Sequence, residues 1–390
     1  MGHVQEQNYQ PAPGNSAQPV QQRVPPLPPL PGRRKPAGEL GLVVGGGILA
    51  FFSLFVVIPF LLASTGSAGF FIGFVASLVP LAAVLLAVYV IDRWEPEPKR
   101  LLLFAFTWGA AVSIAVTLLV QPVFALAYAG PSDEGYLTFM TTVQAPVVEE
   151  FAKGLGLLLL LLLARKHFDG PVDGVVFAFT IAGGFAFTEN ILYFGRAIAE
   201  SSSPATDLAR IFFLRGVMSP FAHAIFIGAT GLIMGFAARR WQPGVSVGAF
   251  LVGLIPAMFL HSRWNSMGEG FLADYVLIQI PIFLLAIGMI VLLRIAENRL
   301  TRQRLLEYAA AGWFTPAEVD LLATAGGRRA AVRWAKTYNR GPQMKTFLKA
   351  ATRLAFTRQR ILSGRDIQTH QSDERQQLHD VVAMRAAVGL

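Results

Sequence analysis

Long apolar stretches alternate with short polar loops along most of this chain. Stretches of roughly 20 residues with few charged side chains have the length that an α-helix needs to cross a bilayer. The pattern predicts an all-α, polytopic helical membrane protein with about eight transmembrane helices. The expected spans are 41–63, 68–91, 101–129, 144–164, 174–195, 210–237, 245–262 and 274–294.

The loops between the expected spans alternate in charge. Arg and Lys are concentrated before the first span and after the second, fourth, sixth and eighth, as at 93–100 and 165–166. The loops on the opposite side carry fewer basic residues. Because cytoplasmic loops of membrane proteins are enriched in Lys and Arg, we expect both termini in the cytoplasm.

The composition supports the membrane assignment and argues against a nucleic-acid partner. Only 15% of the 390 residues are charged, whereas soluble domains carry about 25%. The net charge of +9 does not indicate a nucleic-acid partner, because residues 295–390 hold sixteen Lys and Arg against eight Asp and Glu. Basic segments beside spans typically set topology or contact anionic lipid. With no cysteine, the chain has no disulfide, thiolate metal ligand or cysteine nucleophile.

Composition shifts divide the chain into four expected regions. The head is rich in Gln and Pro, which predicts a disordered, partly polyproline II tail. The regions are a disordered N-terminal tail at 1–40, a transmembrane domain at 41–294, a basic cytoplasmic helical region at 295–364 and a disordered tail at 365–390.

Local signals indicate helices in the third region and a turn in the membrane domain. Thr315 and Glu318 match a helix capping box. Segment 328–356 alternates basic and apolar residues, which fits either a helix on the inner leaflet, where it would contact anionic lipid, or a small solvated bundle. Asp169 and Asp173 are interpreted as turn and N-cap residues of the fifth span.

Ionisable side chains also occur inside the expected spans. Inserting one such side chain into the membrane costs about 2.5–3.5 kcal/mol of free energy when it lies at mid-helix. They lie on spans four to seven, and the alternating span directions place them together in the outer half of the membrane. We interpret them as one functional site. Arg215, near the outer end of the sixth span, could join this site, but a snorkelling interfacial residue is the favoured interpretation. The site residues are Glu149, Glu150, Lys153, Glu189, His223, His261 and Asn265.

Helical spacing refines this site. Lys153 follows the two adjacent glutamates by three and four residues, so it can pair with either. Glu149 and Glu150 lie about 100° apart around the helix axis, so we expect different roles for them. His261 and Asn265 share one helix face, where both can meet a developing oxyanion.

These motifs resemble those of the PrsW family of intramembrane proteases, which is related to the CAAX-processing and bacteriocin-processing proteases. The resemblance covers roughly residues 85–295. It implies a protein of the bacterial cell membrane that hydrolyses peptide bonds of membrane-anchored proteins, such as anti-sigma factors. The matching pieces are DRWEPEP at 92–98, EEFAK at 149–153, FAFTEN at 185–190, His223, and HSRWN at 261–265.

Two mechanisms remain open on these residues. In the first, a divalent ion, favoured as zinc, takes ligands from His223, His261, Glu150 and Glu189, and a second carboxylate acts as general base. In the second, a carboxyl of the Glu149 doublet and His223 activate water without a metal.

Two other functions compete with proteolysis. Ionisable residues inside a membrane also form the relays of proton- or ion-coupled transporters. The same residues could belong to a catalytically silent membrane scaffold. Transporters typically contain internal repeats, and here the polar groups are confined to spans four to seven. This favours the protease.

Overall fold

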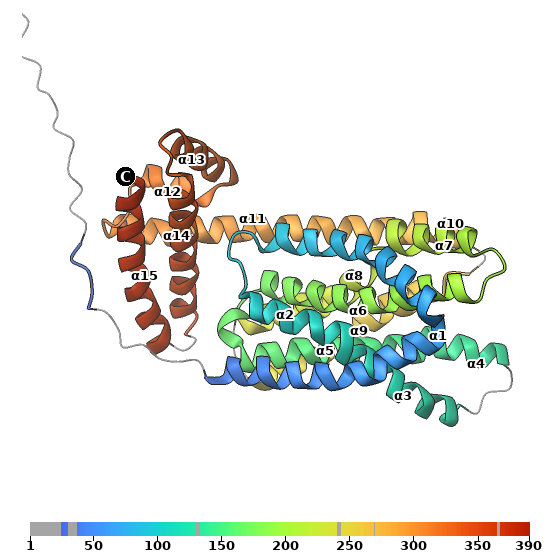
Figure 1. Ribbon diagram of the computed structural model, residues 1–390. Helices are drawn as coiled ribbons and strands as arrows, with labels where there is room; N and C mark the ends of the chain where they lie inside the picture. The colour runs from blue at the N-terminus through green and yellow to red at the C-terminus, as the bar shows by residue number, and fades with distance from the viewer. Residues whose placement is uncertain (1–24, 30–36, 129–132, 240–242, 269, 365–366) are drawn as a thin grey trace, which may run out of the picture.

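The computed structural model describes residues 25–29, 37–128, 133–239, 243–268, 270–364 and 367–390. Its regular secondary structure in these ranges is entirely helical. Figure 1 shows a bundle of helices that run along one common direction, with a smaller helical group, the tail bundle, at one end. The predicted disordered N-terminal tail lies largely outside the described residues.

The membrane bundle consists of α1 to α11 and the π-helical or 3₁₀ turns between them. Its elements are α1 (Ala37–Asp92), α2 (Lys99–Thr107), η1 (Trp108–Ser113), α3 (Ile114–Ala127), α4 (Asp133–Phe139), η2 (Met140–Gln144), α5 (Ala145–Leu163), η3 (Arg165–His167), α6 (Pro171–Ala199), α7 (Pro204–Phe212), η4 (Phe213–Met218), α8 (Ala222–Ala238), α9 (Pro243–Asn265), α10 (Phe271–Asp274), η5 (Tyr275–Gln279) and α11 (Ile280–Ala310).

Six helices in the described residues are long and apolar enough to cross a membrane. The first, Leu40–Asp92, contains a kink at Gly66, whose φ of 64° separates two helical halves. Helix α5 is not among the six; it has three charged side chains within 19 residues. With α1 counted as two halves and α5 included, an apolar helix stands at each of the eight expected positions. The predicted all-α polytopic membrane fold is confirmed.

Helix α6 is the central element of the bundle. In its most apolar stretch 78% of the residues are buried, against 11% in the span that contains α11. It packs against α1, α2, α5, η1 and α8. Glycines allow this close approach: a Cβ on Gly174 would lie 2.0 Å from the backbone oxygen of Gly231 in α8, and one on Gly184 would lie 2.1 Å from that of Phe106 in α2. Small residues at helix contacts are typical of membrane bundles.

Within the described part of the bundle, four π-helical segments interrupt the helices. Such segments rotate the side chains that follow and occur frequently at functional sites. Segment η2 leads directly into α5. Segment η4 is followed by Ser219–Phe221, which are not helical and separate it from α8. These interruptions lie beside two of the helices that carry the predicted site residues.

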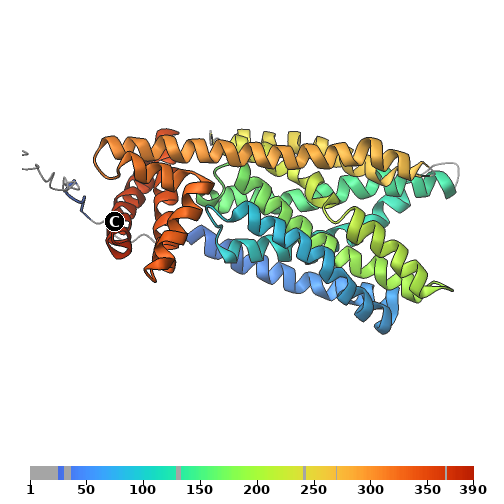
Figure 2. The same cartoon turned by 90° about the horizontal axis from the view of Figure 1, so that it is seen from above.

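Helix α11 leaves the bundle and continues into the tail bundle, as Figures 1 and 2 show. The tail bundle adds α12 (Pro316–Ala323), α13 (Ala325–Thr337), α14 (Gly341–Leu362) and α15 (Ile367–Val388). Thr315 and Glu318 form the predicted capping box at α12. The apolar residues of the tail bundle form a separate core, with Phe314, Phe347 and Leu354 at its centre.

The tail bundle decides two of the sequence predictions. The amphipathic segment 328–356 forms α13 and most of α14 and belongs to a bundle, which was one of its two interpretations. The prediction of a disordered segment 365–390 is wrong for Ile367–Val388, which form α15. Leu378 and Val381 of α15 are buried in the tail core. The polar composition of α15 hid this helix, because its few apolar residues pack against α14 rather than form a long apolar run.

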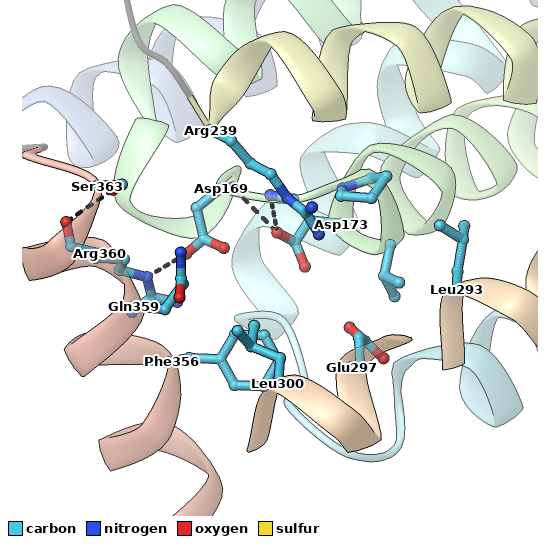
Figure 3. A pocket seen from close by; sticks show the side chains of 13 residues that line it. Asp169, Asp173, Arg239, Leu293, Glu297, Leu300, Phe356, Gln359, Arg360 and Ser363 are labelled. Carbon is cyan, nitrogen blue, oxygen red and sulfur yellow. Dashed lines mark hydrogen bonds and ion pairs between the residues drawn. The ribbon is translucent and has the colours of Figure 1, made fainter. Parts of the chain in front are cut away.

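Ion pairs join the tail bundle to the membrane bundle around a small pocket (Figure 3). Arg360 of α14 bonds to Asp169, and its Nη2 lies 3.0 Å from Glu95 Oε1 in the loop after α1. Burial raises the pKa of Glu95 to about 7, although the Arg360 guanidinium lowers it. Asp173 accepts backbone bonds from Asp169 and Gly170, so it caps the start of α6. The N-cap residue itself is Gly170, and Asp173 is the third residue of the helix, which corrects the predicted N-cap position.

Replacing Gly174 by Ala tests the close packing of α6 on α8. The new Cβ would meet backbone rather than a flexible side chain, so we expect a loss of about 1–3 kcal/mol, the usual range for overpacking. Thermal unfolding in detergent would measure this. The matched control is Gly248→Ala on α9, where nothing lies within 4 Å of the new Cβ. Equal stability of the two variants would contradict the packing argument.

Candidate active site

The first turns of α5 place three charged side chains inside the bundle. Glu150 and Lys153 are fully buried, and Glu149 is 7% exposed. Lys153 Nζ donates a hydrogen bond of 2.6 Å to Glu150 Oε1 and lies 3.7 Å from Glu149 Oε2. Trp108 of η1 donates to the carbonyl oxygen of Ala152 and thereby anchors this part of α5. The ammonium group therefore lies between the two carboxylates, as the helical spacing predicts.

His261 of α9 meets the same carboxylates from the opposite side. Its Nδ1 lies 2.8 Å from Glu150 Oε1, and its Nε2 lies 3.8 Å from Glu149 Oε2. Since a carboxylate only accepts hydrogen bonds, Nδ1 carries the proton and Nε2 keeps a free lone pair. The ring of Phe226 stacks on the imidazole at a centroid distance of 5.0 Å and fixes its plane.

His223 of α8 connects α5 to α6. Its Nδ1 accepts from Lys153 Nζ at 3.1 Å, and its Nε2 donates to Glu189 Oε2 at 2.8 Å. The rings of His223 and His261 are perpendicular, with centroids 5.2 Å apart. Helices α5, α6, α8 and α9 thus converge on one buried polar cluster, which we call the polar centre: Glu149, Glu150, Lys153, Glu189, His223 and His261.

Arg215 is also bonded to the polar centre, which corrects its interpretation as a snorkelling residue. Its Nη2 bonds to Glu189 Oε2, and its Nε donates to Asn190 Oδ1 at 2.7 Å. Its guanidinium lies 4.0 Å from the ring centroid of Tyr193. The π-helical segment η4 carries Arg215, so a regular helix drawn from the sequence gives its side chain the wrong direction.

Asn265 lies differently from expectation. Its amide donates to the carbonyl oxygen of Thr141 in η2, and within the described residues no bond joins it to a side chain of the polar centre. The ring of Phe185 in α6 faces Lys153, whose Nζ lies 4.2 Å from the ring centroid. Asn265 therefore joins α9 to the segment before α5 in this structure.

Three groups of the polar centre have the arrangement of metal ligands. Among the described residues, Glu149, His223 and His261 each offer one ligand atom within 4.8 Å of the others. Glu149 Oε2 is buried without a hydrogen bond. Two imidazoles and one carboxylate are a common catalytic zinc set, with a fourth position left for water. This donor set therefore fits a divalent metal.

The sequence interpretation chose a different carboxylate for the metal. It named Glu150 and Glu189 beside the two histidines. Here Glu150 Oε1 accepts from both Lys153 and His261, and Glu189 Oε2 accepts from Arg215 and His223. The sequence does not show which of the two neighbouring glutamates faces the metal ligands, because this depends on how α9 approaches α5.

A narrow cavity reaches the polar centre beside His223. Its volume is about 20 Å³, and its lining includes Asn190, Arg215, His223 and Trp264. A polar cavity needs roughly 10–15 Å³ to hold one water molecule. Water, the co-substrate of any hydrolysis, thus has a place next to the imidazole.

Sequence reasoning missed Asn190 and Trp264 of this cavity. Both were visible signals, since Asn190 directly follows Glu189 in FAFTEN and Trp264 lies within HSRWN. Neither side chain is ionisable, so neither belongs to the charged groups at a common depth that mark the site in the sequence.

Comparisons with known proteins identify the family of this chain. Residues 97–292 match the family model described as PrsW family intramembrane metalloprotease. The chain is similar to Protease PrsW of Oceanobacillus iheyensis, with 29% identity over 56% of this chain and 93% of that protein. It also resembles Protease PrsW of Bacillus subtilis, with 26% identity over 49% of this chain and 79% of the relative. No solved structure gave a significant match.

The family match spans more than half of the chain and contains every residue of the polar centre. It confirms the predicted enzyme class and favours a protease over a transporter or a silent scaffold. The chain belongs to the PrsW family of intramembrane metalloproteases.

Proposed function

We propose that this protein is an intramembrane endopeptidase that cleaves membrane-anchored proteins, with the polar centre as its active site. The observation that carries the proposal is the ligand triad of Glu149, His223 and His261 beside a water-sized polar cavity. By its relatives' printed name, Protease PrsW, the reaction is peptide hydrolysis.

Glu149, His223 and His261 would hold the metal, which we propose to be zinc. His223 would offer Nδ1, which accepts from Lys153 in this structure, so the Lys153 ammonium would have to release that nitrogen, while Nε2 would keep its bond to Glu189. When bound, a zinc ion acidifies its water ligand and polarises the substrate carbonyl. Glu150 acts on this set through His261: its carboxylate accepts the Nδ1 proton and keeps Nε2 directed toward Glu149. Carboxylates in this position fix the tautomer and orientation of ligand histidines.

Glu189 is proposed as the acceptor of the water proton. Its Oε2 is held by Arg215 and His223, and within the described residues no bond is recorded to its Oε1. It is joined directly to Arg215 and His223, two of the side chains that line the small cavity. Glu189 itself does not line that cavity, and Oε1, the oxygen of this carboxylate without a recorded bond, is the atom that we propose as the proton acceptor.

Lys153 and Arg215 balance the negative charge of the centre. Lys153 contacts Glu150 and Glu149, and Arg215 contacts Glu189. Three carboxylates in a buried site would repel one another strongly at low dielectric. The two cations reduce this repulsion.

The substrate class follows from the location of this site. The polar centre lies among apolar helices, with α5, α6, α8 and α9 on its sides. A peptide bond reaches it only if the substrate segment is itself near or inside the bilayer. We therefore propose single-span or otherwise membrane-anchored proteins as substrates, with anti-sigma factors as the candidates that the resemblance implies.

Removal of the metal is the direct test of this mechanism. We expect a chelator to abolish cleavage of a purified single-span reporter and added zinc to restore it, since the metal supplies the activated water. Metal analysis of the purified protein should find about one zinc per chain. Cleavage that survives complete metal removal would contradict the metal site and favour direct activation of water by the carboxylates.

The two neighbouring glutamates should differ on substitution. Glu149→Gln removes a proposed metal ligand, so we expect loss of both bound zinc and cleavage. Glu150→Gln removes the partner of a ligand histidine, which typically lowers metal affinity or activity about 10–100-fold. Excess zinc should partly rescue the second variant and not the first. Glu200→Gln, at an exposed glutamate at the end of α6, is the control. Identical behaviour of the two variants would contradict the separate roles.

Arg215 should position Glu189 without touching the metal. We expect Arg215→Ala to lower cleavage about 10-fold or more while bound zinc is unchanged, because a buried carboxylate left without its counter-charge reorganises. Arg215→Lys should recover part of the activity, since it keeps the charge but loses the second bond to Asn190. Full activity of Arg215→Ala would show that the ion pair has no catalytic importance.

A further inference from the structure

A second cavity lies where the membrane bundle meets the tail bundle. None of the residues that line it belongs to the polar centre. Its volume is about 650 Å³, and it lies between the end of α1 with the loop after it and helices α13 and α14. We call it the basic groove. Its polar lining consists of Tyr89, Asp92, Arg93, Trp94, Arg328, Arg329, Arg333, Lys345 and Lys349.

The charge in the basic groove is almost entirely positive. Six cationic side chains face one carboxylate, and that carboxylate, Asp92, already accepts the backbone N–H of Glu97 through both oxygens at 3.1 Å. Within the described ranges, no recorded carboxylate pairs with the five outer cations, Arg93, Arg329, Arg333, Lys345 and Lys349. The groove thus concentrates unneutralised positive charge around a space large enough for a polar headgroup.

Arg328 in the basic groove is held by several contacts. The guanidinium of Arg328 lies 3.8 Å from the ring centroid of Trp94, which is only 7% exposed. Arg328 also donates to the carbonyl oxygen of Leu322 at 2.6 Å and to the hydroxyl of Thr352. Burial, with Arg294 and Arg93 nearby, lowers the pKa of Arg328 to about 9. An anion entering the groove would therefore meet a fixed cation in a positive field.

The position of the groove favours a lipid over a soluble anion. Tyr89, in the last turn of α1, is 69% exposed, and Trp94 follows it in the loop. Tyr and Trp at the end of a span are typical of the headgroup level of a membrane. Helix α13 lies beside the end of the bundle in Figure 1, where a flanking leaflet would end. By the excess of Arg and Lys on this side, that leaflet faces the cytoplasm and attracts basic segments through its anionic lipids.

We propose that the basic groove binds the phosphate headgroup of an anionic phospholipid from the leaflet on the tail side. The phosphate would lie among Arg329, Arg333 and Lys349, whose guanidinium and ammonium groups are the usual partners of phosphate. The acyl chains would leave past Tyr89 along α1. The lipid bridges the loop after α1 to α13 and α14, so it also seats the tail bundle on the membrane bundle.

Native mass spectrometry of the full-length protein tests this site. The protein is released from micelles that contain equal amounts of phosphatidylglycerol and phosphatidylcholine. We expect the wild type to retain phosphatidylglycerol preferentially. The groove variant Arg329→Gln, Arg333→Gln, Lys349→Gln should lose this preference by about tenfold or more, because each cation near an anionic surface contributes separately. Substitution of Arg329 and Arg333 by Lys should preserve it.

The matched control removes the same charge outside the groove: Lys336→Gln, Arg353→Gln, Arg375→Gln, all exposed on the tail bundle. It should retain phosphatidylglycerol as the wild type does. An equal loss in both triple variants would overturn the site, since net charge alone would then explain retention. Displacement of the lipid by inorganic phosphate at equal concentration would also overturn it, in favour of a soluble anion. Circular dichroism confirms that each variant is folded.

Discussion

The polar centre depends on the burial of one ammonium group. Lys153 has no exposed surface, and its Nζ contacts Glu150, Glu149 and His223. An unpaired charge in a bilayer-embedded helix is expensive, and breaking one partner of a buried pair costs about 3–5 kcal/mol. Two adjacent carboxylates on α5 are tolerable in this position because the cation lies between them. Helices α8 and α9 must then supply groups that complete the remaining bonds.

This requirement explains why the bundle is packed so closely around α6. Glu189 reaches His223 only if α6 and α8 approach each other, and Gly174 and Gly231 at their contact leave room for no Cβ. The π-helical segments adjust the directions of side chains that a regular helix would turn elsewhere. Segment η4 directs Arg215 to Glu189, and η2 supplies the carbonyl that receives Asn265. Close helix packing and the π-helical segments thus both bring side chains into the polar centre.

Much of this architecture could be predicted from the sequence. The same physical reasons explain which features could not be predicted. Apolar length predicts the helices, and charged residues at a common depth identify the site, since both properties are linear along the chain. Whether Arg215 joins the site or lies at the membrane surface could not be decided from its depth, because its direction depends on the π-helical segment η4. Helix α15 was missed for a related reason: its order comes from contacts with α14 and not from its own composition. The choice of metal carboxylate likewise depends on the approach of α9.

The asymmetry of the glutamate doublet follows from helix geometry together with this approach. Side chains about 100° apart on α5 cannot both face α9 in the same way. Glu150 Oε1 accepts from Lys153 and His261, so that carboxylate is fixed on the inner side of the imidazole. Glu149 Oε2 remains without a hydrogen bond and faces the free Nε2 of the same ring. Glu150 thus has one oxygen that accepts two hydrogen bonds, and its Oε2 is buried without one, whereas within the described residues no hydrogen bond is recorded to either oxygen of Glu149. This contrast favours orientation of His261 as the role of Glu150 and leaves Glu149 as the carboxylate that faces Nε2 of that ring.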